Sequence, residues 1–282
     1  MSTPTPPAAD IPAPLPDPIN LPAVPERRSL LITGGSRGIG AATARLAAAQ
    51  GWDVAINYTR DAAAAQAVAA EVRAAGRRAL LLQADVALEA EVLAMFQALD
   101  QAWGGAAAPG ARALLGGLVN NAGVVDVAAR VDEMSAARIQ RMFAVNVLGT
   151  MVCAREAVLR MSTRHGGTGG VIVNLSSAAA RLGAPGQYVD YASAKGAVDA
   201  FTLGLAREVA TEGIRVNAVR PGIIETEIHA SGGQPGRAAQ MAPWVPMQRA
   251  GSAEEVARAI VWLLGRESSY TTGAVLDVTG GR

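Results

Sequence analysis

Two side chains in the second half of the chain could exchange a proton with a substrate. Tyr191 and Lys195 stand four residues apart in the run YASAK. Positions i and i+4 of a helix share one face, so the phenol and the ammonium can point into the same pocket. A tyrosine with a pKa near ~10 is a poor base at neutral pH, but a neighbouring cation lowers that pKa. The pair is therefore predicted to act as an acid/base centre for an alcohol or a carbonyl group.

The composition gives Lys195 additional weight. Of the 25 basic residues, Lys195 is the one lysine, and all the others are arginine. A guanidinium cannot replace a compact, rotatable ammonium at a tight site. Chance would explain a single lysine taken alone. Its place four residues after a tyrosine, in a chain with four tyrosines, favours a chemical role.

A glycine-rich run near the start of the apolar part of the chain is the second candidate site. The run TGGSRGIG, residues 33–40, follows a short apolar segment and precedes an alanine-rich segment with helical spacing. Such glycines let backbone amides approach a pyrophosphate at a helix start, where the helix dipole favours an anion. The spacing G-x-x-x-G-x-G differs from the G-x-G-x-x-G of larger Rossmann enzymes. The expected dinucleotide-binding residues here are Gly34, Ser36, Arg37, Gly38, Ile39 and Gly40.

The segment after the second predicted strand distinguishes between the two nicotinamide cofactors. An enzyme that uses NAD carries Asp or Glu there to hold the ribose 2′-hydroxyl. Here the segment reads Asn57, Tyr58, Thr59 and Arg60, and the first acid is Asp61. The guanidiniums of Arg37 and Arg60, with nearby hydroxyls, suit a 2′-phosphate. The sequence therefore favours NADP(H) over NAD(H), the alternative being two solvated surface arginines.

The glycine run also fits the G-x-S-x-G pattern of a serine hydrolase, with Ser36 as the nucleophile. That reading needs a histidine partner, and the chain offers only His165 and His229. A nucleophile after the first strand also leaves nothing upstream from which to build an oxyanion loop. The hydrolase is thus the less favoured alternative. A dinucleotide-binding sensor without turnover is another.

These residues need a parallel sheet to position them. From residue 29 onward, short apolar segments alternate with helices of ten or more residues, which is the pattern of βαβ units. The predicted strands are 29–33, 53–57, 79–83, 114–120, 171–175, 216–219 and 274–278, and the predicted helices are 39–50, 62–75, 89–103, 134–161, 191–211 and 253–264. The fold class is therefore α/β, a single doubly wound (Rossmann-type) parallel sheet flanked by helices. Substrate and cofactor should meet beyond the carboxyl ends of the strands. Residues 226–249 lack periodicity and are expected to form a lid or a binding loop.

The composition limits the class of protein further. Half of the 282 residues are hydrophobic. The formal net charge is +1 and the sequence has no long basic run, so neither nucleic acid nor a membrane is indicated as a partner. Residues 1–28 hold nine of the 15 prolines and are predicted to be a disordered tail before a catalytic domain at 29–282. Cys153 is the single cysteine, so no intrachain disulfide is expected. We find no signal-peptide layout, no apolar run that would span a bilayer and no zinc-ligand spacing, so we expect a metal-free cytoplasmic protein.

The motifs, taken in order, resemble those of the single-domain short-chain dehydrogenases/reductases. The resemblance covers roughly residues 29–282. It includes bacterial glucose 1-dehydrogenase-like and 3-oxoacyl-carrier-protein-reductase-like proteins. The matching residues are TGGSRGIG at 33–40, NNAG at 120–123, Asn146, Ser176 with Ser177, Tyr191 with Lys195, and PGIIET at 221–226.

The resemblance implies a role for each matched catalytic position. Tyr191 would be the acid/base, while Lys195 would hold the nicotinamide ribose and lower the Tyr191 pKa. Ser177 would hydrogen-bond the substrate oxygen. Asn146 would fix a helix distortion and a water in a proton relay. The implied reaction is a reversible hydride transfer between NADP(H) and the carbonyl/alcohol pair of a small molecule.

The resemblance also implies the remaining cofactor contacts and the assembly. Asp85 and Val86 would meet the adenine, and the NNAG run would stabilise the sheet and contact the adenosine side. Ile224 and Thr226 would hold the carboxamide. The expected contacts after the fourth and sixth strands are Asn121, Ala122, Gly123, Pro221, Gly222, Ile224 and Thr226. A homotetramer or a dimer is implied, with residues 253–264 and 274–278 as its interface.

One spacing departs from the family pattern. From Ser177 to Tyr191 the chain advances 14 residues, one more than is common in close relatives. The extra residue leaves Ser176 as an alternative to Ser177. It also makes Tyr188 an alternative to Tyr191, but Tyr188 lacks a lysine four residues later, since position 192 is alanine. The motifs do not name the substrate. Acyl-carrier-protein thioesters, sugars, steroids and small ketones all fit them.

Overall fold

The computed structural model describes residues 28–104 and 115–282 of the chain. Residues 1–27, which make up nearly all of the predicted proline-rich tail, lie outside the described residues, as do residues 105–114.

The described strands form one seven-stranded parallel sheet in the order β3-β2-β1-β4-β5-β6-β7. The chain builds outward from β1 in one direction and then, from β4, in the other. This is the doubly wound arrangement that the sequence predicts. The strands are β1 (Arg28–Ile32), β2 (Trp52–Tyr58), β3 (Ala79–Gln83), β4 (Leu115–Asn120), β5 (Gly170–Leu175), β6 (Ile214–Pro221) and β7 (Val275–Val278).

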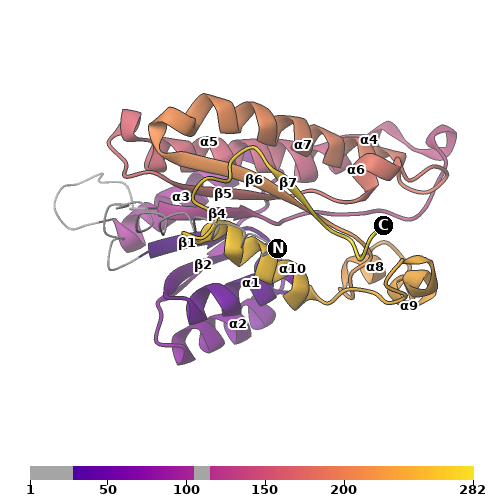
Figure 1. The fold of residues 1–282 in the computed structure, drawn as a ribbon, viewed down its shortest axis with the longest axis horizontal. Helices are drawn as coiled ribbons and strands as arrows, with labels where there is room; N and C mark the ends of the chain where they lie inside the picture. Colours follow the sequence, from indigo (N-terminus) through magenta and orange to yellow (C-terminus); the bar gives the residue numbers. More distant parts are fainter. Residues whose placement is uncertain (1–27, 105–114) are drawn as a thin grey trace, which may run out of the picture.

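Helices cover both faces of the sheet, so the domain has three layers (Figure 1). One face carries α1 (Gly38–Ala49), α2 (Ala62–Ala74) and α10 (Ala253–Leu264). The other face carries α3 (Glu89–Trp103), α4 (Ala136–Phe143), α5 (Gly149–Met161) and α7 (Val189–Val209). Three short helices lie in connections, namely α6 (Ala179–Leu182), α8 (Ile228–Ser231) and α9 (Arg237–Met241).

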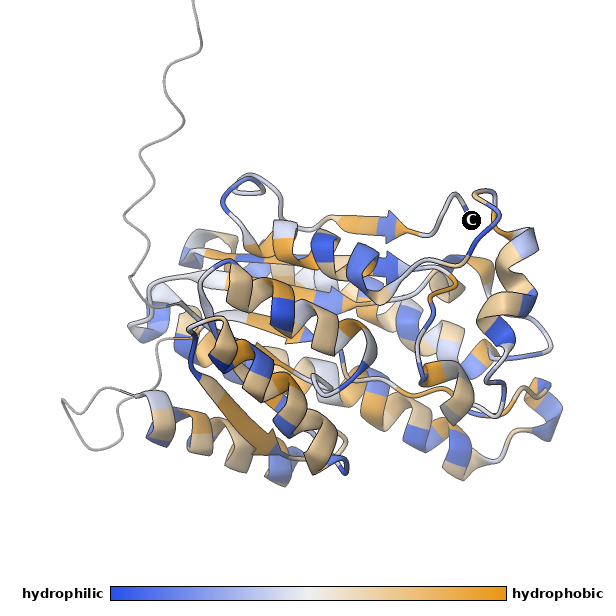
Figure 2. Ribbon diagram, turned by 90° about the horizontal axis from the view of Figure 1, so that it is seen from below, coloured by the Kyte–Doolittle hydropathy of each residue, from blue (hydrophilic) through white to orange (hydrophobic). Residues whose placement is uncertain are grey.

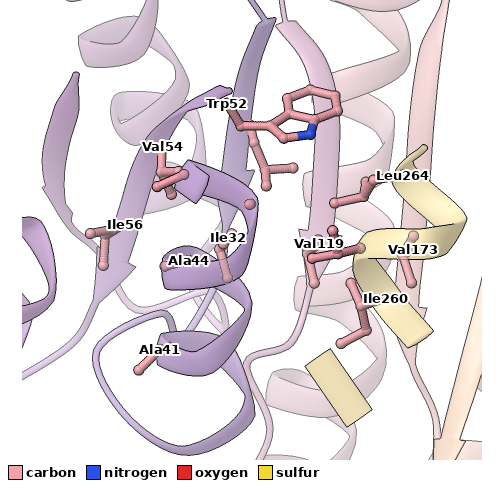
Figure 3. Close-up of a cluster of buried hydrophobic side chains, with 14 of the residues drawn as sticks. Ile32, Ala41, Ala44, Trp52, Val54, Ile56, Val119, Val173, Ile260 and Leu264 are labelled. Carbon is pink, nitrogen blue, oxygen red and sulfur yellow. The ribbon is translucent and has the colours of Figure 1, made fainter. Parts of the chain in front are cut away.

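Two hydrophobic cores fill the spaces between the layers, because alternate residues of a strand point to opposite faces. In β1, Leu30 and Ile32 pack toward α1 and α10, while Leu31 packs toward α3 and α5. Figure 3 shows part of the first core, in which Ile260 of α10 lies near Val173 of β5. Figure 2 shows the central strands largely in hydrophobic colours, between helices of mixed character.

The helix predicted over residues 134–161 is interrupted. A π-helical turn, Ala144–Leu148, separates α4 from α5. By length and composition, residues 136–161 could cross a membrane, contrary to the expectation that the chain has no such run. Half of the apolar window is buried inside the protein, however, and α5 packs against β4 and α3. These residues therefore form a core helix.

Two segments near the expected site differ from the prediction in detail. Helix α7 begins at Val189, two residues earlier than predicted, so that Tyr191 lies within its first turn rather than at its start. Asp190 favours this earlier start, because an acid in the first turn complements the helix dipole. The expected irregular lid contains α8 and α9, which lie beyond one end of the sheet near the C terminus (Figure 1).

Candidate active site

Most of the expected site residues follow the carboxyl ends of six strands, β1 to β6, and therefore gather along one edge of the sheet. The glycine turn at 33–40 follows β1, and the NNAG run begins in the last residue of β4. Ser177 follows β5, and the 221–226 run begins in the last residue of β6. Helix α7 starts at the same edge, because it runs antiparallel to β6, which follows it after a short turn.

Three of the four expected catalytic side chains are close together. Tyr191 lies on α7, and its hydroxyl is hydrogen-bonded to the side chain of Ser177. The Lys195 Nζ lies 5.6 Å from the centroid of the Tyr191 ring. Lys195 is only 3% exposed, and its Nζ donates a hydrogen bond to the Leu175 carbonyl oxygen at 2.7 Å. Tyr191 is half-buried. The phenol can therefore meet a substrate from the open side while the ammonium lies beneath it.

The geometry distinguishes Ser177 from Ser176 and Tyr191 from Tyr188, the two pairs of alternatives that the sequence leaves open. The Ser176 hydroxyl is buried and donates to the Lys195 carbonyl oxygen at 3.3 Å, so it holds α7 and not the Tyr191 hydroxyl. Tyr188 is buried, and its ring lies 5.1 Å beneath the guanidinium of Arg237. Ser177 and Tyr191 thus remain the pair at the open edge.

The pKa of Tyr191 differs from the sequence-based expectation. Burial raises the pKa of Tyr191 to about 12, and the hydrogen bond from Ser177 opposes this rise. Lys195 is not among the causes of this shift. The ammonium is turned to the Leu175 carbonyl oxygen. Burial also lowers the pKa of Lys195 to about 8, while the nearby Asp199 carboxylate opposes that change. A phenol with a raised pKa keeps its proton at neutral pH.

Asn146 lies in the π-helical turn between α4 and α5 and is fully buried. Its Nδ2 donates to the Met142 and Val124 carbonyl oxygens, both at 3.0 Å, and its Oδ1 accepts from the Val124 N–H at 3.3 Å. The expected helix distortion is thus present at this residue. A Cβ placed on Gly123 would lie 2.8 Å from the Asn146 Oδ1 and 3.6 Å from the Lys195 Nζ. Gly123 therefore lets the NNAG backbone approach both side chains.

The glycine turn after β1 has the shape of an anion site. Gly34 and Gly38 have φ angles of +61° and +53°, in the left-handed region that favours glycine. A Cβ on Gly40 would lie 2.4 Å from the Gly34 carbonyl oxygen, so only glycine fits there. The first amides of α1, which begins at Gly38, have no intrahelical acceptor and are free to bind an anion.

Asn121 and Thr33 hold this turn in place. The Asn121 Nδ2 donates to the carbonyl oxygens of Thr33 and Gly34, both at 2.9 Å. The Thr33 hydroxyl oxygen accepts the N–H groups of Asn121 and Ala122, both at 3.0 Å. Asn121 thus shapes the glycine turn, which is a more specific task than the general stabilisation expected of the NNAG run.

The residues that would select the cofactor lie beside this turn. Arg37 is exposed and directly precedes α1, and the segment after β2 contains Tyr58, Thr59 and Arg60, the last two exposed. Within residues 28–104 and 115–282, neither the Arg37 nor the Arg60 guanidinium makes an ion pair or a hydrogen bond with the protein. Two guanidinium groups thus lie near the glycine turn and could pair with an anionic group of a cofactor.

The remaining expected contacts lie on either side of the turn. Asp85 and the buried Val86 follow β3, and the Asp85 Oδ1 accepts the Ala87 N–H at 3.0 Å. The Thr226 side chain reaches the glycine turn, where its Cγ2 would lie 3.4 Å from a Cβ on Gly38. Ile224 is buried, and its side chain belongs to the first core.

The serine hydrolase alternative lacks a nearby histidine among the described side chains. Ser36 lies at the carboxyl edge of the sheet, after β1. His165 precedes β5 and therefore lies at the opposite, amino edge. The side chain of His229 lies outside the part of the chain that the structure describes.

Several residues that shape the site carry no motif in the sequence. The Asn57 side chain accepts the Gly34 N–H at 3.1 Å and donates to the Leu82 and Ala84 carbonyl oxygens at 3.2 and 3.0 Å. Arg138 pairs with Asp190 at 2.9 Å. Their partners lie 23 to 52 residues away in the chain, so only the fold reveals them.

Comparison with known proteins finds relatives along most of the chain. The model of a family described as enoyl-(acyl carrier protein) reductase matches residues 34–282. An uncharacterized oxidoreductase of Escherichia coli (strain K12), YgfF, is 53% identical over 252 residues, which are 89% of this chain and 98% of that protein. Glucose 1-dehydrogenase 2 of Bacillus subtilis (strain 168) is 34% identical, over 90% of this chain and 94% of that protein.

A solved structure shows the same arrangement. A short-chain dehydrogenase from Burkholderia cenocepacia J2315, in complex with NADP, superposes with a TM-score of 0.79 at 36% identity. The match covers 91% of this chain and 97% of that one.

Proposed function

The chain belongs to the short-chain dehydrogenase/reductase family of NAD(P)-dependent oxidoreductases, and from this premise we propose that it is an NADPH-dependent carbonyl reductase with Tyr191 as its proton donor. The observation that carries the proposal is the cluster of Ser177, Tyr191 and Lys195 at the edge of the sheet where the glycine turn also lies.

The proton chemistry follows from the state of Tyr191. When bound, the nicotinamide supplies the hydride that reduces a carbonyl carbon to an alcohol carbon. The carbonyl oxygen then needs a proton, and Tyr191, with its pKa raised to about 12, carries one at neutral pH. Reduction of a ketone or an aldehyde requires this protonated form of Tyr191, and the reaction is reversible.

The neighbouring residues orient the substrate and the phenol. Ser177 is hydrogen-bonded to Tyr191 and is partly exposed, so both hydroxyls can bind one substrate oxygen. Lys195 lies beneath the Tyr191 ring, where its ammonium would hold the ribose of the nicotinamide. Asn146 is held by hydrogen bonds to Met142 and Val124. It adjoins Gly123, near the Lys195 Nζ, and would there take part in a proton relay.

The preference for NADPH rests on Arg37 and Arg60. Each offers a guanidinium without a protein partner in the described residues, and no carboxylate side chain occurs between the end of β2 and Asp61, which caps α2. A hydrogen bond to a charged group contributes about 1.5–3 kcal/mol, so each arginine should matter for a 2′-phosphate and little for a 2′-hydroxyl.

The first test compares cofactors and variants. Consumption of NADPH and of NADH should be followed over aldehydes, ketones, sugar lactones and a 3-oxoacyl thioester. We expect turnover with NADPH to be well above that with NADH. Arg60→Ala should raise the KM for NADPH about tenfold or more and leave that for NADH unchanged. Arg164→Ala, an exposed arginine at the opposite edge, is the control and should change neither.

The outcomes separate the parts of the proposal. Preference for NADH would contradict the assignment of Arg37 and Arg60 but not that of Tyr191. Binding of NADPH without turnover of any carbonyl would contradict the reductase and favour a dinucleotide sensor.

We also propose, from the family resemblance, that the protein forms a homotetramer or a dimer through α10 and β7. Each of these elements carries a partly exposed large apolar side chain, Trp262 on α10 and Leu276 on β7.

A further inference from the structure

The four residues before Tyr191 are held by two arginines from other elements. Arg237 of α9 donates to the Gln187 side chain at 2.7 Å and lies over the Tyr188 ring. Arg138 of α4 holds the other end of this segment, because its Nε donates to the Asp190 Oδ2 at 2.9 Å. Asp190 directly precedes Tyr191, so the Arg138 pair lies nearest to Tyr191 along the chain.

Asp190 is bonded to the backbone of Tyr191 itself. The Asp190 Oδ1 accepts the Tyr191 N–H at 2.9 Å. Tyr191 lies in the first turn of α7, where an N–H has no intrahelical acceptor, so the Asp190 side chain supplies the missing partner. Asp190 is 5% exposed. Arg138 stabilises the charge of this carboxylate, because burial of an unpaired carboxylate costs free energy.

The same guanidinium reaches a second part of the site. The Arg138 Nη1 donates to the Val127 carbonyl oxygen at 2.6 Å. Three residues earlier, Val124 exchanges hydrogen bonds with the side chain of Asn146. Arg138 thus connects the start of α7 to the segment that holds Asn146.

We propose that Arg138 is a positioning residue, which acts through Asp190 to fix the Tyr191 hydroxyl relative to Ser177 and Asn146. The inference rests on the proposed reductase function. Arg138 touches neither Ser177 nor the Tyr191 hydroxyl, and its effect on the reaction passes through the backbone of Tyr191.

The kinetic test compares Arg138→Met with a matched control. Arg138→Met keeps a long side chain but removes the bonds to Asp190 and Val127. A displacement of a catalytic group by about 1 Å can cost about 100-fold in rate, so we expect kcat to fall about 10- to 100-fold. The KM and the dissociation constant for NADPH should stay unchanged. Arg138→Lys, which keeps the charge, should recover part of kcat.

The control is Arg160→Met. Arg160 is a buried arginine, paired with Asp100 at 2.6 Å and Glu156 at 3.0 Å. It lies at the end of α5, before the turn that leads into the amino end of β5, and so at the edge of the sheet away from Tyr191. Arg160→Met should lower the melting temperature much as Arg138→Met does, but leave kcat unchanged.

A second readout needs no turnover. Lys195 is the one lysine in the chain, so protein grown on [ε-¹³C]lysine gives a single side-chain signal. The Lys195 Nζ lies 5.6 Å from the centre of the Tyr191 ring, so the ring current acts on the neighbouring ε-methylene group. A displaced ring should therefore move this signal in Arg138→Met and not in Arg160→Met.

The two readouts distinguish this inference from the proposed function. A wild-type protein without turnover would contradict the reductase, while a shifted Lys195 signal in Arg138→Met would still support the positioning of Tyr191. An unshifted signal, or a kcat in Arg138→Met equal to that of the wild type, would overturn the inference.

Discussion

At the scale of single residues, the ionisation of Lys195 decides how much charge lies beneath Tyr191. Lys195 is buried, which lowers its pKa from the ordinary 10.5 to about 8. The carboxylate of Asp199, one helical turn further along α7, opposes this change. Asp199 is itself buried, and its Oδ2 accepts two hydrogen bonds from Arg220, at 3.0 and 2.8 Å.

We predict that Asp199→Asn lowers the Lys195 pKa below that of the wild type. Without the carboxylate, the ammonium loses stabilisation while its burial remains, so it releases its proton at lower pH. A pH titration of the single [ε-¹³C]lysine signal measures this directly, with an expected wild-type pKa of about 8.

Asp277→Asn is the matched control for that titration. Asp277 also pairs with Arg220, at 3.5 Å, but lies on β7 rather than on α7. Its removal should leave the Lys195 pKa unchanged. Titration of the wild-type signal near 10.5, or an equal pKa in Asp199→Asn, would show that neither burial nor Asp199 governs Lys195.

The sequence identifies single residues only where their partners are near in the chain. Tyr191 and Lys195 can be paired because four residues place them on one helix face. The raised pKa of Tyr191 could not be predicted, since it arises from burial by distant elements. Arg138 and Asp190 lie 52 residues apart, and no local pattern connects them.

At the scale of elements, the junction of β1 and α1 depends on the lack of a side chain at Gly40. A Cβ there would lie 2.4 Å from the Gly34 carbonyl oxygen and 2.6 Å from the Asn121 Nδ2, so the turn would have to shift. Overpacking of this kind costs about 1–3 kcal/mol. We predict that Gly40→Ala weakens NADPH binding about tenfold or more, as measured by fluorescence titration.

Gly204→Ala provides the comparison. Gly204 also lies within a helix, α7, but a Cβ there would meet nothing within 4 Å. This variant should bind NADPH like the wild type and melt at a slightly higher temperature, because alanine favours the helix by about 1 kcal/mol. If both variants bind alike, the glycine turn does not form the cofactor site.

The elements with strong periodicity could be predicted almost to the residue, as with α3 at Glu89–Trp103 and α10 at Ala253–Leu264. The π-helical turn at Ala144–Leu148 could not be predicted from periodicity, because its apolar residues continue the helical pattern on both sides; only the family resemblance implies a distortion there, at Asn146. The short α8 and α9 were also missed. Helices of one turn gain little from local propensity and form where tertiary contacts support them.

At the scale of the whole molecule, the order of strands and helices fixes where the site lies. Alternation of buried strands with helices predicts a parallel sheet, and a parallel sheet brings the segments that follow its strands, with most of the expected site residues, to one edge. The location of the site could therefore be predicted from the sequence. The distances within it could not, because they depend on how α7, the 124–127 segment and the glycine turn pack against one another.

The most direct test of the account is the rate of carbonyl reduction by Tyr191→Phe with NADPH. This variant removes the hydroxyl that Ser177 binds but keeps the ring above Lys195. A positioned general acid contributes about 100- to 10,000-fold, so kcat should fall by that factor, while the dissociation constant for NADPH stays unchanged. A Tyr191→Phe protein that reduces the same carbonyl at the wild-type rate would contradict the assignment of Tyr191 as the proton donor.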